Sequence, residues 1–591
     1  MWCLLVTVGK LESEKLAIFI VSTTGQGDPP DMMKIFWKFL LRRSLSTAWL
    51  KSLKFAVFGL GDSGYLQYNV VGKKLDRRLH DLGGMPIIER GLGDDQHPSG
   101  YEASLDPWLV SLWTAMASIS GRPYALHTLS YDNLALDRPK YNIIICKTSS
   151  EVSTRKVGDL EEVNRAVRML DSADAMHGVK ETVDFSVICP RNPYLARMVC
   201  NKRLTRNFSE REVHHIEFDL GSSGLTYEPG DALAVMPSQS EVMVDAFMNR
   251  CCLDPDSIVL VQAASKQNDF WQGDSNMNKP VTVRTLVQSV MDIASASPRR
   301  YFLEVMSHFA TAEHEKERLR YFVSPEGRDD LYQYNQRERR TVLEVLEDFP
   351  SVQLPLEWLL QLVPRLQPRL FSISSSLIMH PNQVHITVAV QKWRTPLKRT
   401  RHGLCSTWLS CLEPQKGEIY VPIWCKKGLK FPDASMPLLL VGPGTGCAPF
   451  RALIEERVAM SVVSGVAPIM FFFGCRQEQD DFLYKDFWLA QAEDSGVLST
   501  TKGGGFFAAF SRDQPRKVYV QHKIEEYSAK VWAMLQSGCA VYVAGSAVKM
   551  PADVFAALEK VVMKEGCQSE DAARKWLKHL ERVGRYHVEA W

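Results

Sequence analysis

The chain lacks the features that mark a membrane protein or a nucleic-acid-binding protein. Its 591 residues contain no run of about 18 apolar residues, so no segment is long enough to cross a bilayer as a helix. The 70 basic and 68 acidic side chains leave a net charge of +2, which does not indicate a nucleic acid or an anionic membrane as partner. The first residues lack the basic start and the cleavage site of a signal peptide. We therefore expect a cytoplasmic protein.

Metal ligands and disulfides are also poorly represented. The 13 cysteines are scattered, with no C-x-x-C pair and no zinc spacing, which is typical of reduced thiols in the cytosol. The adjacent His214 and His215 fall in an alternating strand pattern, where we expect them to be structural. The sequence therefore predicts no metal site.

The first 120 residues alternate short apolar strands with helical stretches. Strands are expected at 16–22, 54–58 and 85–90, and helices at 32–41, 71–82 and 105–116. Such alternation predicts a parallel sheet covered by helices. A loop rich in glycine and aspartate follows each strand, and in parallel sheets ligands bind at the carboxyl ends of the strands. We expect a ligand site built from these three loops.

The rest of the chain divides into three stretches. Residues 121–180 have weak periodicity and more charge, which favours a linker. Residues 181–432 contain two sets of strands around a mostly helical segment at about 238–362. Residues 433–591 again alternate strands and helices. This pattern predicts a multidomain α/β protein with a β-rich middle domain that carries a helical insertion.

A glycine-rich turn of sequence GPGTG, at 442–446, joins an apolar strand to an amphipathic helix. Glycines let the backbone approach a ligand closely, and the free N–H groups at the start of a helix hold a phosphate. Taken alone, the turn fits an ordinary strand-to-helix loop equally well. The next strand favours a ligand role for Gly444 and Thr445, because it ends in FFFGCR and so places a cation, Arg476, close after a second strand.

Further cationic and hydroxyl side chains follow in the same domain, at Ser511, Arg512, Lys517 and Tyr519, with Gln521 beside them. This set suits the 2′-phosphate of NADPH, whereas an NAD site more often carries a carboxylate for the ribose hydroxyl. A solvated basic patch is the alternative interpretation of these residues alone. Together with the glycine turn, they indicate that a phosphorylated nicotinamide dinucleotide binds in the carboxyl-terminal domain.

Two upstream motifs suit a flavin. RLFSISS, at 369–375, offers Arg369 for a pyrophosphate, Phe371 to stack on an isoalloxazine ring and Ser372 near its N5. GLCSTW, at 403–408, places Gly403, Cys405 and Ser406 at an expected helix start. In isolation the first motif is also compatible with a serine-rich turn that carries a surface arginine.

Two aromatic residues each have two possible roles. Trp591 ends the chain in an apolar segment, where it is either a frayed tail or a ring that lies on a flavin and moves aside for nicotinamide. Tyr65 follows the loop at 59–63 and is either a core tyrosine or a second flavin-stacking ring.

In this order, the motifs resemble the diflavin reductase family, which joins a flavodoxin-like FMN domain to a ferredoxin-reductase-like unit for FAD and NADPH. The motifs are TTGQGDPPD, FGLGDSGY, LGDDQ, RLFSISS, GLCSTW, GPGTGCAPFRA, FFFGCR, FSRDQ, KVYVQH and the terminal tryptophan. The resemblance implies a partial flavodoxin-like domain over 1–120 and a linker over 121–180. It also implies an FAD-binding β-barrel with a helical insertion over 181–432 and a Rossmann-like NADP-binding domain over 433–591.

The resemblance also assigns residues to cofactors. For FMN it implies Thr24, Gly25, Gln26, Gly61, Tyr65, Asn69 and Asp94. For FAD it implies Arg369, Phe371, Ser372, Gly403, Cys405, Ser406 and Trp591, and for NADPH Gly444, Thr445, Arg476, Ser511, Arg512, Lys517, Tyr519 and Gln521. Ser372, Glu589 and Trp591 match positions near hydride transfer, where Ala544 stands in place of the cysteine of a related motif.

The chain departs from the family pattern at two places. The family begins with a strand and a hydroxyl-rich loop for the FMN phosphate, and this sequence has neither, so FMN binding is open to question and the strand at 17–21 would expose an edge. Residues 1–8 are a hypothetical substitute strand. The segment TKGGGFF, at 501–507, interrupts the approach to the FSR motif and is expected to loosen the 2′-phosphate site.

These features predict an oxidoreductase that passes electrons from NADPH to FAD, to FMN and then to a protein acceptor. By resemblance, the acceptor is an iron–sulfur protein similar to anamorsin, in cytosolic iron–sulfur cluster assembly, and the reductase is a monomer. One alternative is a single-flavin NADPH diaphorase that lacks FMN. The other is a truncated, non-enzymatic chain that competes for the partner.

Overall fold

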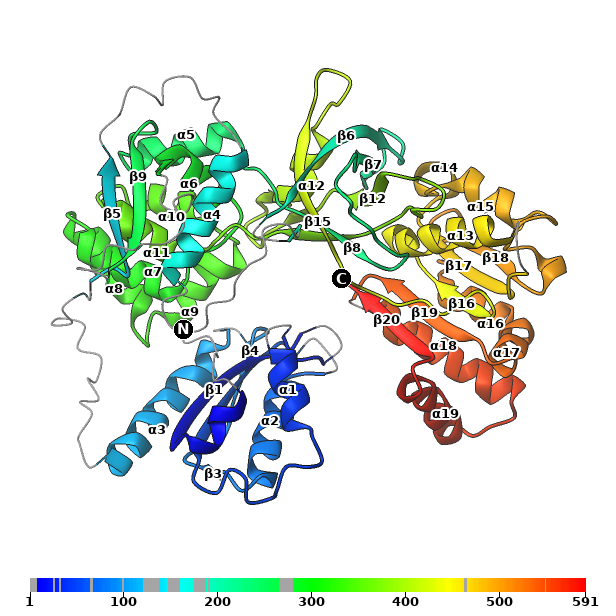
Figure 1. Cartoon of the computed structure of the whole chain (residues 1–591), viewed down its shortest axis with the longest axis horizontal. Coiled ribbons are helices and arrows are strands. Elements are labelled where there is room, and N and C mark those ends of the chain that lie inside the picture. The colour runs from blue at the N-terminus through cyan, green and yellow to red at the C-terminus, as the bar shows by residue number, and fades with distance from the viewer. Residues whose placement is uncertain are drawn as a thin grey trace. The chain divides into compact units, whose positions relative to one another are not determined.

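The structure is a computed structural model that describes residues 8–24, 27–30, 33–63, 67–97, 100–120, 136, 138–146, 160–174, 188–189, 192–264, 280–461, 465–547 and 549–591. The chain divides into two compact units. The first comprises Met1–Val183, Val242–Arg365 and Thr395–Arg399, and the second Asp184–Glu241, Leu366–Arg394 and Thr400–Trp591. Each unit therefore contains segments that are distant in sequence (Figure 1).

The first unit begins with a parallel sheet, as expected from the alternation of strands and helices. Strand β2 (Lys54–Gly61) pairs with β1 (Leu16–Ser22), β3 (Met85–Pro86) and β4 (Gly91–Asp94). The strand expected at 85–90 is split in two, and Pro86, which has no N–H to donate, stands at the end of β3. A 3-10 helix, η1 (Val8–Ser13), precedes β1, whereas residues 1–7 of the hypothetical substitute strand lie outside the described residues.

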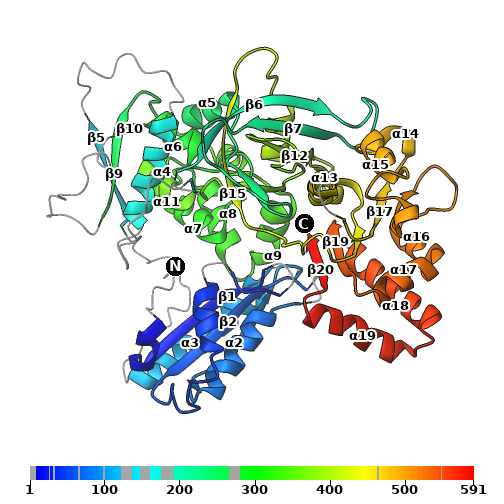
Figure 2. The ribbon, with the colours of Figure 1, turned by 45° about the vertical axis from the view of Figure 1, so that its right-hand side comes forward.

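Helices cover both faces of this sheet (Figures 1 and 2). Alternation along β2 sends Phe55 and Val57 toward α1 (Lys34–Leu40) and α2 (Val70–Asp81). It sends Ala56 and Phe58 toward α3 (Glu102–Ser120). Strand β1 ends the sheet in the described part of the chain, with Ile20 54% exposed.

The helical insertion also belongs to the first unit and has its own core. It contains α5 (Glu241–Arg250), α6 (Val283–Ser289), α7 (Arg300–Phe309), α8 (Glu313–Val323), α9 (Arg328–Leu331), the π-helical η4 (Tyr332–Arg337), α10 (Val342–Asp348) and α11 (Leu356–Leu362). A capping box between Thr341 and Glu344 starts α10, because each side chain bonds the other's backbone N–H.

The expectation of a plain linker over 121–180 is wrong for two segments. Strand β5 (Tyr141–Cys146) pairs antiparallel with β9 (Ile258–Ala263), whose other neighbour is β10 (Val281–Thr282). Helix α4 (Leu160–Asp174) buries Ala166, Met169 and Leu170 in the core of the insertion. Both segments need partners far along the chain, so their local patterns are weak.

An antiparallel six-stranded sheet forms the barrel of the second unit. Its order is β11 (Arg369–Ser372), β8 (Ala232–Val235), β15 (Tyr420–Lys426), β6 (Tyr194–Arg203), β7 (Val213–Asp219) and β12 (Gln383–Ala389). A bridge between Ile373 and Ile386 joins the two ends of this order, so the sheet closes on itself. The hairpin of β13 (Lys392–Arg394) and β14 (Thr400–His402) then leads to α12 (Leu404–Ser410).

A parallel five-stranded sheet completes the second unit. Its order is β18 (Gly505–Phe510), β17 (Ile469–Cys475), β16 (Leu438–Val441), β19 (Ala540–Gly545) and β20 (Tyr586–Ala590). Part of the expected insertion at 501–507 is this edge strand, because Gly505, Phe506 and Phe507 pair with β17. The turn before it is the 3-10 helix η6 (Thr500–Lys502). The segment therefore extends the sheet and does not interrupt it.

Each face of this sheet has its own layer of helices (Figures 1 and 2). Leu438, Leu440 and Phe471 pack toward α13 (Ala448–Ser461) and α15 (Lys485–Ala492). The opposite side chains pack toward α16 (Val520–Glu526), α17 (Ser528–Gln536), α18 (Met550–Glu565) and α19 (Glu570–Arg582). Within the described residues, no helix has both the length and the hydropathy to span a bilayer.

Candidate functional site

Three loops meet at the carboxyl edge of the first sheet, because parallel strands end on the same side. Asp94, at the end of β4, accepts hydrogen bonds from the backbone N–H of Ser63 at 2.8 Å and of Gln96 at 3.0 Å. Burial opposes ionisation of Asp94, but these hydrogen bonds outweigh it and lower the pKa of the carboxyl group. Gln96 also donates to Asp62 at 3.0 Å. The loops after β2 and β4 are therefore held together by Asp94.

Asn69 supports the same edge from the start of α2. It is fully buried, has a φ of 53°, and donates from Nδ2 to the carbonyl of Gly93 at 2.8 Å. Its Oδ1 is buried without a hydrogen-bond partner in the described part of the chain. A Cβ at Gly61 would lie 2.7 Å from Asn69 Cγ, so glycine is needed there. A buried amide oxygen without a partner among the described residues, at this edge of the sheet, fits a polar ligand such as FMN.

Other residues expected to bind FMN are placed only in part. Thr24 follows β1 and accepts the N–H of Asp28 at 2.8 Å through its carbonyl, which closes a tight turn. Gly25, Gln26 and Tyr65 lie outside the described residues. The structure thus brings the Thr24 loop, Gly61, Asn69 and Asp94 to one edge of the sheet.

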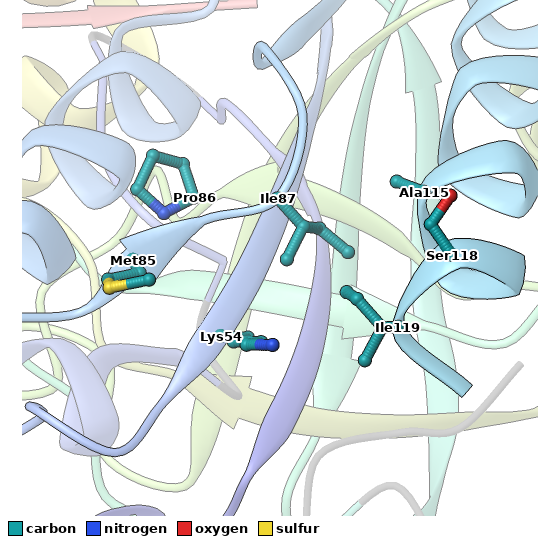
Figure 3. A pocket seen from close by; sticks show the side chains of 7 residues that line it. All are labelled: Lys54, Met85, Pro86, Ile87, Ala115, Ser118 and Ile119. Carbon is teal, nitrogen blue, oxygen red and sulfur yellow. The ribbon is translucent and has the colours of Figure 1, made fainter. Parts of the chain in front are cut away.

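A shallow pocket at the other edge of this sheet is not part of that site. It is lined by Lys54, Met85, Pro86, Ile87, Ala115, Ser118 and Ile119 (Figure 3). Lys54 begins β2, so the pocket lies at the amino ends of the strands, opposite the loops. Its lining is mostly aliphatic, and Lys54 is its one titratable group.

The two motifs expected to bind FAD come together on the barrel. Arg369, Phe371 and Ser372 lie on β11, opposite β8. Arg369 is close enough to Cys405 of α12 to favour its thiolate electrostatically, but burial dominates and raises the pKa of Cys405 to about 12. Cys405 is therefore a buried, unreactive thiol. Any polar contact to FAD from this motif comes from the residues beside it.

Ser406 fastens α12 to the hairpin that precedes it. Its Oγ accepts the N–H of Gln391 at 3.1 Å and donates to the carbonyl of Gly403 at 3.3 Å. A Cβ at Gly403 would lie 2.8 Å from Ser406 Oγ, so this close contact requires glycine. The next hydroxyl, Thr407 Oγ1, is buried without a hydrogen-bond partner in the described residues. The donor chemistry here fits a phosphate or ribityl group of FAD.

The glycine turn after β16 lies tightly against β19. It forms the 3-10 helix η5 (Gly444–Cys447), which continues into α13. A Cβ at Gly446 would lie 2.1 Å from the carbonyl oxygen of Ala544, and Gly444 has a φ of 60°. Both glycines are therefore required by the backbone, and nothing fills the space beside Gly444 within 4 Å. The open side of the turn is free for a nucleotide.

Helix α13 ties this turn to the FAD motif. Arg451 pairs with Glu455 at 2.7 Å and donates to the carbonyl of Ser374, just after β11. Glu455, 4% exposed, accepts the N–H of Ser376 at 2.8 Å. The ion pair thus joins the helix that follows the nucleotide turn to the segment that follows RLFS.

Cations gather at the carboxyl edge of the second parallel sheet. Arg476 follows β17 and Arg512 follows β18, and the N–H of Arg512 donates to the carbonyl of Arg476 at 2.7 Å. Ser511 is buried beside them, and its N–H donates to Cys475 at 3.0 Å. These contacts show that the motifs ending β17 and β18 are adjacent. Two guanidinium groups beside a hydroxyl suit a phosphate.

Glu210 and Arg211 belong to this cluster, and the sequence did not reveal them. The Glu210 carboxylate contacts Arg476 at 2.7 Å and Arg512 at 3.2 Å. Hydrogen bonding and attraction from Arg512 and Arg476 lower the pKa of Glu210, whereas burial and repulsion by Arg476 lower the pKa of Arg211. The only local signal is a charged run, SERE, between β6 and β7.

Lys517, Tyr519 and Gln521 lie at or just before the start of α16. Tyr519 is 41% exposed, and Gln521 Nε2 donates to Asp553 at 3.4 Å. The segment that carries these three residues follows β18, whose carboxyl end is also followed by Arg512. No hydrogen bond joins them to the two arginines in the residues that the structure describes.

The carboxyl terminus forms the last strand of the same sheet. Glu589 pairs with Ala544 across β20 and β19, and burial raises the pKa of Glu589 from 4.5 to about 7. Its Oε2 has no hydrogen-bond partner in the described residues. Trp591 is 52% exposed, but its N–H donates to Gly545 at 3.0 Å, so it is docked and not frayed. Ser372 lies on another sheet, and no hydrogen bond in the described part of the chain joins it to Glu589 or Trp591.

Three family models match consecutive parts of the chain. The flavodoxin model matches residues 4–108, the FAD binding domain model 188–408, and the oxidoreductase NAD-binding domain model 440–555. These matches cover the sheet with the three loops, the barrel strands before β15, and the strands of the second parallel sheet from Leu440 in β16 to β19. They support FMN, FAD and a nicotinamide nucleotide as ligands of the three parts.

Relatives match almost the whole chain. NADPH-dependent diflavin oxidoreductase 1 of Arabidopsis thaliana is 53% identical over 98% of this chain and 91% of its own length. The protein of the same name from Danio rerio is 40% identical over 99% of this chain and 92% of its own length. NADPH–cytochrome P450 reductase of Dictyostelium discoideum is 31% identical over 98% of this chain and 83% of its own length.

The carboxylate in the arginine cluster generates a first prediction. Glu210→Gln should tighten NADP⁺ binding about two- to fivefold, because a 2′-phosphate no longer competes with an exposed ion pair for Arg476 and Arg512. Isothermal titration with NADP⁺ measures this. Glu228→Gln, whose partner Lys427 lies outside the cluster, is the matched control and should bind as the parent does. Weaker binding by Glu210→Gln would contradict the assignment.

Burial of Glu589 generates a second prediction, for the chain without bound flavin. Between pH 4.5 and about 7 the folded chain keeps a proton that the unfolded chain has lost, so its stability falls as pH rises through this window and then levels off. Glu589→Gln should not show this decrease in the free energy of unfolding, which amounts to at most about 3 kcal/mol in the parent. Thermal unfolding from pH 4.5 to 8 measures the difference, with Glu581→Gln on the exposed surface of α19 as control. Parallel curves for Glu589→Gln and the parent would refute the prediction.

Proposed function

The chain belongs to the diflavin reductase family of NADPH-dependent oxidoreductases, and from that premise we propose that it delivers electrons singly from NADPH, through FAD and then FMN, to an iron–sulfur protein. The family membership rests on 53% identity to a relative that the chain nearly spans. NADPH-dependent flavoprotein electron transfer with FAD and FMN follows from the family and from its three matching models. The order of electron transfer and the acceptor are our proposal.

One observation carries the proposal for the electron donor. Arg476, Arg512 and Arg211 converge beside Ser511 at the carboxyl edge of a parallel sheet. Such a concentration of guanidinium groups is costly unless an anion is present, and Glu210 is the one anion that bridges two of them among the described residues. A 2′-phosphate is an anion of suitable charge, so NADPH is favoured over NADH.

The chain's own residues bind and orient the cofactors. We assign Gly444 and Thr445 to the NADPH phosphates, with Lys517, Tyr519 and Gln521 at the same edge. We assign Arg369, Gly403 and Ser406 to the FAD phosphates, with Phe371 against its ring. Ser372, Glu589 and Trp591 are assigned to the surroundings of the reacting atoms, where the indole excludes water. The flavins, when bound, supply the conversion of a hydride into single electrons.

At the first sheet, Thr24, Gly61, Asn69 and Asp94 are assigned to FMN. Asp94 holds two loops through the N–H groups of Ser63 and Gln96, and Asn69 presents a buried, unpartnered Oδ1 in the described part of the chain. These residues build one side of a flavin site. We propose that this part of the chain faces the protein acceptor, and the resemblance supports an iron–sulfur protein of the anamorsin type.

The decisive experiment measures flavin content and acceptor reduction on the same preparation. We expect one FAD and one FMN per chain after acid extraction, and NADPH-dependent reduction of a purified iron–sulfur acceptor of the anamorsin type as well as of ferricyanide. Asp94→Asn is expected to lower FMN content and acceptor reduction while ferricyanide reduction through FAD persists. Glu102→Gln, on the same domain, is the control.

Two results would contradict the proposal. FAD without FMN, with dye reduction only, would identify a single-flavin diaphorase. Both flavins with no transfer to the iron–sulfur protein would refute the acceptor.

A further inference from the structure

Two histidines and a glutamate, side-chain types that bind metals, share one face of the barrel, and His385 among them is hydrogen-bonded to Ser374 and Ser375 of the segment after β11. His215 and Glu217 lie two residues apart on β7, and His385 stands directly opposite Glu217 on β12. Their neighbours Ile216, Phe218 and Ile386 point the other way, into the barrel core. Strands β7 and β12 lie next to one another (Figure 1), and their antiparallel register therefore places two imidazoles and one carboxylate side by side.

The ligating atoms are close together and largely buried. One nitrogen from each histidine and one Glu217 oxygen all lie within 4.8 Å of one another. His215 Nε2 is 3.0 Å from Glu217 Oε1, and the two imidazole rings are 5.1 Å apart. A tetrahedral zinc ion, with bonds of about 2.0–2.1 Å, places its ligand atoms about 3.4 Å apart. Small side-chain movements are enough to reach that geometry.

The protein leaves ligand capacity unused in this cluster. His385 is 2% exposed, and its Nδ1 has no hydrogen-bond partner in the described residues. In the described part of the chain Glu217 has no lysine or arginine partner, and its ion pair is with His215. A buried orphan nitrogen beside a carboxylate suits a cation.

Tyr484, at the start of α15, orients the cluster from outside. Its hydroxyl is 3.0 Å from His215 Nδ1 and 2.7 Å from Thr387 Oγ1. This contact fixes the ring of His215 with Nε2 toward Glu217, the arrangement in which metal-ligating histidines are commonly held. The nearby His380 and Arg451 both pair with Glu455. The Glu455 carboxylate is therefore engaged in these ion pairs and is not counted among the ligands.

We propose that His215, Glu217 and His385 form a binding site for a divalent transition metal ion, with zinc as its most suitable occupant. Two imidazoles, one carboxylate and an open fourth position match the ligands that zinc takes. The site lies where β7 and β12 meet Tyr484, whose hydroxyl contacts His215 Nδ1 from the nucleotide-binding part of the same unit. It is independent of the electron acceptor proposed above.

The full chain, stripped with EDTA and dialysed, tests this site. Zinc binding is measured by equilibrium dialysis with elemental analysis, and Co²⁺ binding by electron paramagnetic resonance, which oxidised flavins do not disturb. We expect one tightly bound ion in the parent and at least about tenfold weaker binding in Glu217→Gln and His385→Asn. His214→Gln is the matched control, because that adjacent histidine bonds Asn201 and Glu212 on the other face.

Retention of FAD and the unfolding temperature show whether each variant folds. If His385→Asn does not fold, Glu217→Gln decides, because glutamine keeps a hydrogen bond to His215. Absence of stoichiometric zinc in the parent would overturn the proposal. So would equal binding by the parent and Glu217→Gln, or equal losses in His214→Gln and Glu217→Gln.

Discussion

The buried ion pair between Arg451 and Glu455 is the contact on which the arrangement of the second unit depends. Its two charges lie 2.7 Å apart, and each partner also contacts the segment after β11: Arg451 donates to the carbonyl of Ser374, and Glu455 accepts the N–H of Ser376. Such a pair contributes little net stability, because desolvation offsets attraction, but removing one partner leaves an uncompensated buried charge. Its consequence is therefore geometric: it aligns the segment after RLFS with the helix after GPGTG.

That alignment matters because hydride transfer requires donor and acceptor to be held at near contact. Apart from Trp591, the residues assigned to FAD lie on β11 and at the start of α12, whereas those assigned to NADPH lie at the edge of a parallel sheet. Neither sheet alone carries both sets of assigned residues. Parallel topology places Arg476, Ser511 and Arg512 at one edge of the sheet. Helix α13, which belongs to the same parallel domain, contacts the barrel through Arg451 and Glu455.

Local patterns were enough to predict elements whose partners are close in sequence. The step from β16 through the glycine turn to α13 and the alternation of the first sheet follow from periodicity and glycine placement, and the fold class is confirmed by the three family models. The Asp94 loop could be anticipated because parallel strands end together. The roles of the individual site residues stay predictions.

Features that depend on distant partners could not be predicted in this way. Glu210 contacts Arg476, which lies 266 residues later in the sequence. The local sequence around Glu210 therefore shows only a run of charges typical of an ordinary loop. Strand β5 pairs with β9, although its local sequence pattern indicates a linker. Phe506 and Phe507 of β18 pair with β17, although their local pattern indicates an insertion. Alternation along β7 indicates two faces, but only the register with β12 shows that His385 lies beside Glu217.

The rate of flavin reduction by saturating NADPH tests the central claim about Arg451 and Glu455 most directly. In stopped-flow bleaching of the flavin absorbance, Glu455→Gln should react at least about tenfold more slowly than the parent while it retains FAD, because the barrel and the nucleotide turn are no longer aligned. Glu456→Gln, one residue along α13, should react as the parent does. An unchanged rate in Glu455→Gln with full FAD content would contradict the claim.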